Sequence, residues 1–159
     1  MIQPKTIHGS ALVLGERGIL IRGRSGSGKS TLLRELLAAD PQGTRMIADD
    51  RVIVAAVHGR LLADVPREIA GFVEMRGVGV IKAPYIAPAV IHLVVDLASL
   101  EAAPRMPEAD EVVVALEGIT LPRLVLPVGF TGGAGSITAA VTLLTAQGEA
   151  DCLLRCGIE

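Results

Sequence analysis

The sequence of 159 residues is poor in aromatic side chains, with one Tyr, two Phe and no Trp. Its hydrophobic content of 50% is therefore mostly aliphatic, which is typical of a core built around an α/β or mixed sheet. An excess of positive charge is also lacking, because 15 Lys and Arg face 17 Asp and Glu. The resulting net charge of −2 argues against nucleic acid as a partner. The length predicts one domain over residues 1–159.

Membrane, export and redox signals are missing too. A membrane-spanning helix needs about 20 mostly apolar residues, and the best stretch, 78–95, is interrupted by a lysine, two prolines and a histidine. The N-terminus lacks the apolar segment of a signal peptide. Cys152 and Cys156, the only cysteines, are too few for a metal or redox site and favour a structural role. These absences predict a soluble, cytoplasmic protein without a membrane partner.

A phosphate-binding motif is present at residues 23–30, which fit G-x-x-x-x-G-K-[ST]. The motif follows a strand-like run and opens a helix-like run over 31–37, as a P-loop requires. Its glycines let backbone N–H groups face phosphate oxygens, and the helix N-terminus adds partial positive charge. We predict that this motif binds ATP and Mg²⁺, and that the Ser30 hydroxyl contacts the metal. The residues predicted to bind ATP are Gly23, Arg24, Ser25, Gly26, Ser27, Gly28, Lys29, Ser30 and Thr31. A glycine-rich turn without a ligand is the alternative.

The pattern of strands predicts a mixed sheet. Three pairs of strand-like runs flank short turns and predict β-hairpins at 10–14 with 18–21, 52–57 with 61–65, and 112–116 with 119–121. A hairpin that leads into a P-loop differs from doubly wound folds, in which helices connect parallel strands. Residues 90–96 are the clearest buried strand, and 136–146 are predicted to form the last helix.

Two adjacent acids, Asp49 and Asp50, follow the short strand 45–48. Successive side chains at a strand end point in different directions, so one acid can act as a base while the other holds Mg²⁺. A turn or helix-cap pair is the alternative. Glu74 and Arg76 would share one face of an extended strand and serve metal and phosphate, or equally form a surface ion pair. His8 alone is ambiguous between a structural and a functional role.

Four blocks of this sequence resemble the catalytic domain of HPr kinase/phosphorylase. They are T-I-H-G at 6–9, the P-loop at 23–30, I-A-D-D-R-V at 47–52 and V-E-M-R-G-V-G-V-I at 73–81. The E-x-R-G-x-G pattern in the last block is the most specific. The family phosphorylates a serine of HPr, the phosphocarrier of the sugar phosphotransferase system, and reverses that modification. The resemblance covers roughly 6–128 and implies an α/β P-loop domain with a mixed sheet and flanking helices, related to the nucleotide-binding fold of phosphoenolpyruvate carboxykinase.

The resemblance also implies roles for individual residues. Asp49 would be the general base toward the seryl hydroxyl, and the general acid in the reverse reaction. Asp50 and Glu74 would hold or orient the metal with Ser30, and Arg76 and His8 would support the phosphate site. The expected partner is HPr, and the family assembles as a homo-oligomer, a hexamer.

Three features depart from the family pattern. The chain begins almost at the catalytic block, which resembles the short proteobacterial form, and Thr31 stands where many members have an acid. Residues 129–136 contain no Arg, whereas the family has a basic segment there that contributes to oligomer contacts and dephosphorylation. Kinase activity is therefore better supported than phosphorylase activity. The alternatives are another P-loop small-molecule kinase and a nucleotide sensor without turnover. A transporter ATPase is excluded because the L-S-G-G-Q segment is absent.

Overall fold

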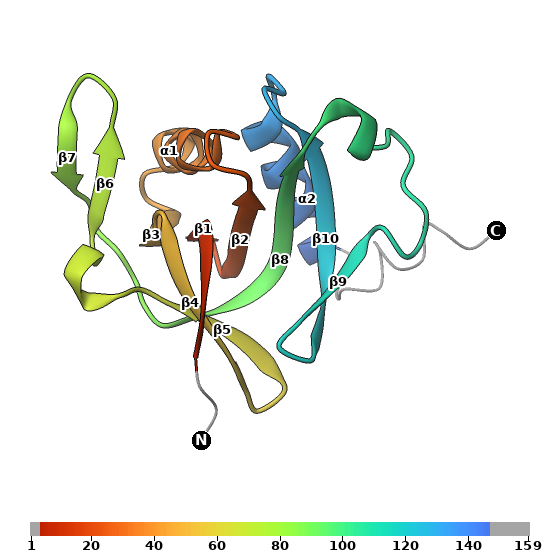
Figure 1. Ribbon diagram of the computed structural model, residues 1–159, viewed down its shortest axis with the longest axis horizontal. Helices are drawn as coiled ribbons and strands as arrows, with labels where there is room; N and C mark the ends of the chain where they lie inside the picture. Colours follow the sequence, from red (N-terminus) through yellow and green to blue (C-terminus); the bar gives the residue numbers. More distant parts are fainter. Residues whose placement is uncertain (1–3, 147–159) are drawn as a thin grey trace.

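The computed structural model describes residues 4–146, which form a curved main sheet, a separate β-hairpin and two α-helices (Figure 1). The main sheet contains β1 (Lys5–Leu14), β2 (Arg17–Gly23), β3 (Thr44–Ala48), β4 (Arg51–Val57), β5 (Arg60–Asp64), β8 (Ala89–Ala98), β9 (Val113–Leu116) and β10 (Ile119–Pro127). The other elements are α1 (Lys29–Ala39), α2 (Gly133–Ala146), β6 (Phe72–Met75), β7 (Gly79–Lys82) and short 3-10 helices at Arg67–Ile69 and Leu100–Ala102.

The three predicted hairpins are confirmed, because β1 pairs with β2, β4 with β5 and β9 with β10, all antiparallel. In two of the turns, His58-Gly59 and Glu117-Gly118, both residues have positive φ, the backbone that matches the twist of a hairpin. Strand β8 instead runs parallel to both β2 and β10. The sheet is therefore mixed, as predicted. The order β2-β1-β4-β5-β8, with a further β2–β8 pairing, closes five strands into a ring.

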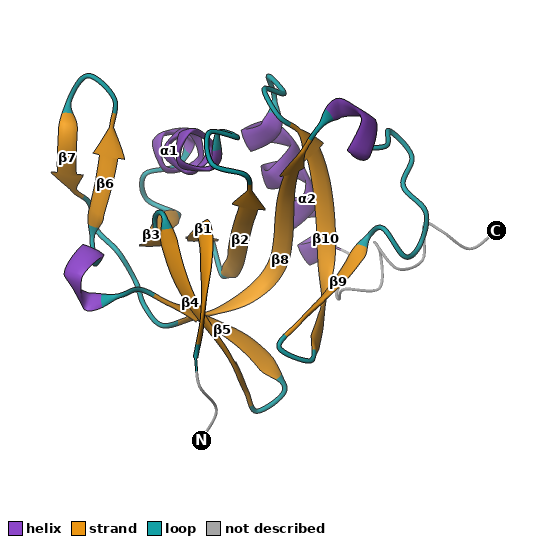
Figure 2. Cartoon of the chain, viewed as in Figure 1, coloured by secondary structure: helices purple, strands orange, loops and turns teal. Residues whose placement is uncertain are grey.

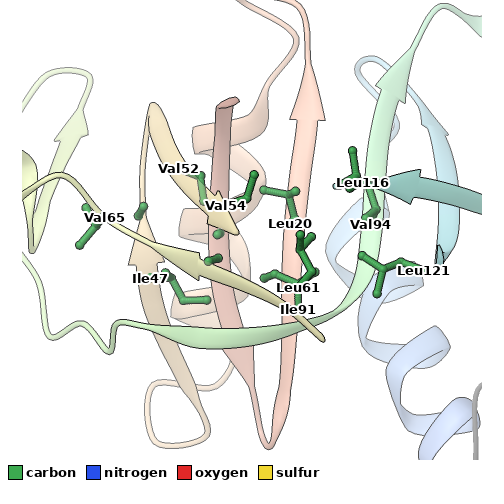
Figure 3. Close-up of a cluster of buried hydrophobic side chains, with 13 residues drawn as sticks. Leu20, Ile47, Val52, Val54, Leu61, Val65, Ile91, Val94, Leu116 and Leu121 are labelled. Carbon is green, nitrogen blue, oxygen red and sulfur yellow. The ribbon is translucent and has the colours of Figure 1, made fainter. Parts of the chain in front are cut away.

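Hydrophobic side chains are buried on both faces of the sheet. Ile19 and Ile21 of β2 belong to the same cluster as Leu33 of α1 and Ile137 of α2, so both helices cover one face (Figure 2). Leu20, between them in sequence, belongs to a second cluster on the other face, with residues from β3, β4, β5, β8, β9 and β10 (Figure 3). Burial on both faces explains why the central strands are continuous apolar runs rather than alternating ones.

The block 72–81 forms the hairpin β6–β7 outside the main sheet (Figure 1). Strand β6 ends at Met75, and Arg76 lies in the turn, followed by Gly77 with φ of 84°. The prediction that Glu74 and Arg76 share one face of a strand is therefore wrong, because the chain turns before it reaches Arg76.

The helix predicted over 31–37 is present as α1, and the helix predicted from Ser136 begins earlier, at Gly133. The Ser136 N–H donates to the Gly132 carbonyl oxygen at 2.8 Å, which closes the first turn of α2 within the glycine-rich segment. Cys152 and Cys156 lie outside the described residues. Among residues 4–146, no helix is both long and apolar enough to cross a membrane.

Candidate functional site

The predicted phosphate-binding loop connects the end of β2 to the start of α1 (Figure 1). Gly26 and Gly28 have φ of 77° and 98°, a region that residues with a Cβ rarely adopt. A Cβ on Gly23 would lie 2.5 Å from Ser27 Oγ and 3.1 Å from the Leu97 carbonyl oxygen. The glycines of the motif therefore meet backbone and steric requirements of this loop. The first N–H groups of α1, which have no intrahelical partner, follow directly after it.

Lys29 is the first residue of α1 and is only 6% exposed. Its Nζ donates to the carbonyl oxygens of Gly23 at 3.0 Å and Arg24 at 2.8 Å, so the side chain spans the loop. Burial lowers the pKa of Lys29, and the charges of Asp50 and Asp49 act in the opposite direction. The amine thus lies at the loop, where it can reach phosphate oxygens.

Asp49 is buried directly after β3, with 8% exposure. Its Oδ1 accepts hydrogen bonds from Ser10 Oγ and from Ser30 Oγ, each at 2.7 Å. The hydroxyl that the P-loop motif assigns to the metal is therefore paired with Asp49 rather than with Asp50.

Asp50 has the opposite environment. Its side chain is 70% exposed, and its backbone has φ of 72°. Its carbonyl oxygen accepts from the Gly9 N–H at 3.1 Å and from His8 Nδ1 at 3.0 Å. The same His8 nitrogen lies 3.3 Å from Asp50 Oδ1. One of the two adjacent acids is thus enclosed and hydrogen-bonded, and the other is open to solvent beside a histidine.

Arg34 is a site residue that the sequence reasoning missed. Its Nη1 donates to the Glu74 carbonyl oxygen at 2.8 Å and its Nη2 to Thr31 Oγ1 at 3.2 Å, so it connects α1 to the β6–β7 hairpin. A signal was available, because residues four apart share a helix face and Arg34 is four residues after Ser30. Ser10, also missed, had no comparable local signal.

Two cavities of about 480 and 360 Å³ bring most of the predicted residues together. Ser30, Arg34, Asp50 and Arg76 line both of them, so the cavities adjoin. The predicted residues that line at least one cavity are His8, Ser25, Gly26, Gly28, Lys29, Ser30, Thr31, Asp49, Asp50, Glu74 and Arg76. Of the other three, Gly23 and Arg24 accept hydrogen bonds from Lys29 at their carbonyl oxygens, and Ser27 is buried within the loop. Arg76 therefore reaches the site from a turn rather than from a strand.

A third cavity, of about 540 Å³, adjoins the loop as well. It shares Gly26, Gly28 and Thr31 with the 480 Å³ cavity. Its other walls include Leu97, Leu126, Val128 and the half-exposed Phe130. The space beside the loop is thus polar and charged toward Asp50 and largely apolar toward Phe130.

An ion-pair cluster anchors the strand that leads into the loop. Asp96 of β8 accepts two hydrogen bonds from Arg22, at 2.8 and 2.7 Å, and one from Arg123 of β10 at 2.6 Å. Burial acts to raise the pKa of Asp96, but the hydrogen bonds and charges of Arg22 and Arg123 outweigh it and hold that pKa below its ordinary value. Because Arg22 directly precedes Gly23, the cluster ties the start of the loop to β8 and, through Asp96, to β10.

The residues at the loop fit a metal that arrives with a nucleotide. Within residues 4–146, no three His, Cys, Asp or Glu side chains converge as a metal-binding group. Mg²⁺ commonly binds one or two carboxylates and completes its shell with waters and substrate phosphates, so a cage of protein ligands is not required. The Ser30 hydroxyl and the Asp49 carboxylate are such a donor set. Glu74 lines the 360 Å³ cavity with them and accepts from Arg34 at its backbone carbonyl oxygen, and its role toward the metal stays a prediction.

Comparison with known proteins identifies related sequences. Residues 1–147 match the family described as HPr Serine kinase C-terminal domain. The HPr kinase/phosphorylase of Clostridium tetani is 38% identical over 84 residues, 52% of this chain and 27% of that protein. The HPr kinase/phosphorylase of Streptococcus equi subsp. zooepidemicus is 35% identical over 134 residues, 77% of this chain and 42% of that protein. The matched region is thus less than half the length of either relative.

A solved structure has the same fold. The Hpr(Ser) kinase/phosphatase from Coxiella burnetii matches with a TM-score of 0.74 and 22% sequence identity, over 90% of this chain and 97% of that one. The predicted α/β class with a mixed sheet and flanking helices is therefore confirmed. The family match spans the P-loop, both adjacent acids and the β6–β7 hairpin, and this chain therefore belongs to the HPr Serine kinase C-terminal domain family.

Proposed function

We propose that this chain transfers the γ-phosphoryl group of ATP to a serine of the phosphocarrier HPr. The observation that carries the proposal is the pairing of Ser30 with the buried Asp49 beside the P-loop, with Asp50 exposed next to it. Family membership and the names of the relatives support HPr as the substrate. Phosphoryl transfer mainly requires alignment and charge neutralisation, and the two polar cavities supply groups for both.

Ser30 and Asp49 would hold Mg²⁺. When bound, this ion neutralises charge on the phosphates of ATP. Ser10 donates to the same carboxylate oxygen and so orients Asp49 from the side of β1. Lys29, now hydrogen-bonded to the loop carbonyls, would exchange those bonds for phosphate oxygens.

Asp50 is the better candidate for the general base. The resemblance suggested Asp49, but Asp49 already accepts two hydroxyls and is 8% exposed. A serine that belongs to another protein must reach the base from solvent, and the Asp50 side chain is 70% exposed. His8 beside Asp50 would hold its carboxylate in place.

Groups of this site account for the proton and for the charge that the reaction transfers. The seryl oxygen bonds to the γ-phosphorus as its proton passes to the Asp50 carboxylate. The bond from the γ-phosphorus to the bridging oxygen breaks, and ADP leaves. Arg34 and Arg76, which line both cavities, would stabilise the negative charge on the transferred group. The reverse step, attack of inorganic phosphate on phosphoserine, would use the same base as an acid.

The nucleoside would occupy the cavity beside Phe130. This cavity shares Gly26, Gly28 and Thr31 with the phosphate cavity, so a nucleotide can extend from one to the other. Phe130 offers an aromatic face for a base to stack on. The homo-oligomeric state and cytoplasmic location expected from the sequence remain part of this proposal.

The proposal is tested by incubating the purified chain with Mg²⁺, ATP and HPr from the same organism and then measuring the intact mass of HPr. We expect one added phosphate on HPr, with wild-type rates in Asp110→Asn, a control that alters an exposed acid outside both cavities. Adding inorganic phosphate to the product tests the reverse reaction. ATP binding without any transfer would contradict the kinase assignment and favour a nucleotide sensor, and transfer to a small molecule would favour the other P-loop kinase.

A further inference from the structure

A fourth cavity, with a distinct chemistry, lies where β8 changes its pairing partner from β5 to β10. The first part of β8, at Ala89–Ile91, pairs with β5, and the later part, at Val94–Ala98, pairs with β10. Between β5 and β10 a cavity of about 410 Å³ opens, which we term the fork cavity. It is lined by Arg17, Gly59, Arg60, Leu61, Val90, Ile91, His92, Leu93, Ile119, Thr120, Leu121, Pro122 and Val141.

The fork cavity is separate from the nucleotide site. None of its lining residues lines any of the three cavities around the P-loop. Strand β2 begins at Arg17, beside the fork cavity, and ends at Gly23, where the loop begins. Six residue steps of a strand span about 20 Å. A ligand in the fork cavity would therefore leave the phosphate-binding loop free.

The titratable side chains that line the fork cavity are Arg17, Arg60 and His92, and no carboxylate is among its described lining residues. Within residues 4–146, neither guanidinium has an ion-pair partner. Burial lowers the pKa of His92, and Arg17 and Arg60 lower it further, against the effect of the Val90 carbonyl. The three groups line the same cavity, and the charges of both arginines act on the imidazole.

His92 lines the fork cavity with one ring nitrogen held by the backbone. The Gly18 N–H donates to His92 Nδ1 at 3.0 Å, so in the neutral ring the proton belongs to Nε2. A Cβ at Gly18 would meet the Val90 carbonyl oxygen at 1.9 Å, so only glycine allows β2 to approach β8 this closely. The tautomer of His92 is therefore a consequence of this strand contact.

The remaining walls are mostly apolar. Leu61 and Ile91, labelled in Figure 3, come from β5 and β8, and Leu121 comes from β10. Two planar guanidinium groups beside an imidazole suit an oxyanion, whereas the aliphatic side chains suit a carbon skeleton. The volume is within the range of small-molecule sites.

We propose that the fork cavity binds a small organic anion, in which a phosphate or carboxylate group on an apolar skeleton contacts Arg17, Arg60 and His92. The proposal is independent of kinase activity. Phenyl phosphate and benzoate are suitable probes, because each joins an anionic group to an apolar ring, and together they distinguish the phosphate from the carboxylate.

The test follows the ring nitrogens of the three histidines by NMR in the ¹⁵N-labelled full chain during titration. His92 reports on the fork cavity and His8 on the nucleotide site, whereas His58 directly precedes the lining residues Gly59 and Arg60 and does not serve as a control. We expect saturable shifts of His92 without parallel shifts of His8. The double substitution Arg17→Gln/Arg60→Gln should weaken binding about tenfold or more, since charge-assisted hydrogen bonds are lost.

The matched control is Arg67→Gln/Arg105→Gln, which removes two positive charges at exposed positions outside the cavity and should bind like the wild type. Inorganic phosphate should bind more weakly than phenyl phosphate, because it leaves the apolar walls unused. No shift of His92 with either probe would overturn the proposal. An equal affinity in the Arg17→Gln/Arg60→Gln variant would also overturn it.

Discussion

Replacing Asp50 by Asn separates the roles of the two adjacent acids. The substitution preserves size but removes the charge and the ability to accept a proton. The Asp50 carbonyl, which accepts from Gly9 at 3.1 Å and His8 at 3.0 Å, is unaffected, and Asn tolerates the φ of 72° as well as Asp does. Because the side chain is 70% exposed, the free energy of unfolding should change by less than about 0.5 kcal/mol.

The expected effect is on the chemical step. A general base contributes about 10²- to 10⁴-fold, or about 2.7 to 5.4 kcal/mol of barrier, so kcat should fall by that factor. The KM for ATP should change less than about threefold, since Asp50 accepts the seryl proton and does not hold the nucleotide. Asp49→Asn should instead raise the Mg²⁺ concentration for half-maximal activity about tenfold or more, because the carboxylate paired with Ser30 loses its charge.

Initial rates of HPr phosphorylation, measured by intact mass across ATP and Mg²⁺ concentrations, distinguish these outcomes. Asp110→Asn controls for the loss of an exposed acid. A wild-type kcat in Asp50→Asn would contradict the role of Asp50 as the base. A loss of kcat in Asp49→Asn with an unchanged Mg²⁺ requirement would return that role to Asp49.

Three further predictions concern the loop, its anchor and the cavity beside Phe130. Gly23→Ala places a Cβ 2.5 Å from Ser27 Oγ and 3.1 Å from the Leu97 carbonyl oxygen, so we expect the ATP affinity measured by calorimetry to fall about tenfold; an unchanged Kd would contradict this. Asp96→Asn should lower the free energy of unfolding in urea by about 2 to 4 kcal/mol, because Arg22 and Arg123 lose their buried anion. The folded-state pKa of Asp96 lies below its ordinary value of 3.8, so the stabilisation by its carboxylate is complete above pH 3.8 and is lost as the pH falls below that value. A difference in unfolding free energy between wild type and Asp96→Asn that persists undiminished in stronger acid would contradict this role of the ion pairs. Phe130→Ala should raise the KM for ATP about fivefold or more with little change in kcat, because base stacking is lost, whereas Phe130→Tyr should behave like the wild type; equal KM values in all three proteins would place the nucleoside elsewhere.

Local patterns were sufficient for much of the fold. The glycine loop between a strand and α1, the three hairpins and the mixed sheet were predicted correctly, because each depends on short-range signals: glycines that need positive φ, turns of two residues and apolar runs. The start of α2 was misplaced because a glycine-rich stretch reads as a loop. The tertiary structure nevertheless closes the first helical turn from Gly132 to Ser136.

The sequence alone is enough to bring Lys29 and Ser30 together in one loop, because the motif ties them by covalent proximity. The difference between the two acids depends on the tertiary structure. Asp49 is enclosed because Ser10, 39 residues earlier, and Ser30, 19 residues earlier, both donate to it. Asp50 follows it with a left-handed backbone and stays exposed. Burial and partners of a side chain depend on strand pairing across the whole chain, and no local pattern encodes that pairing.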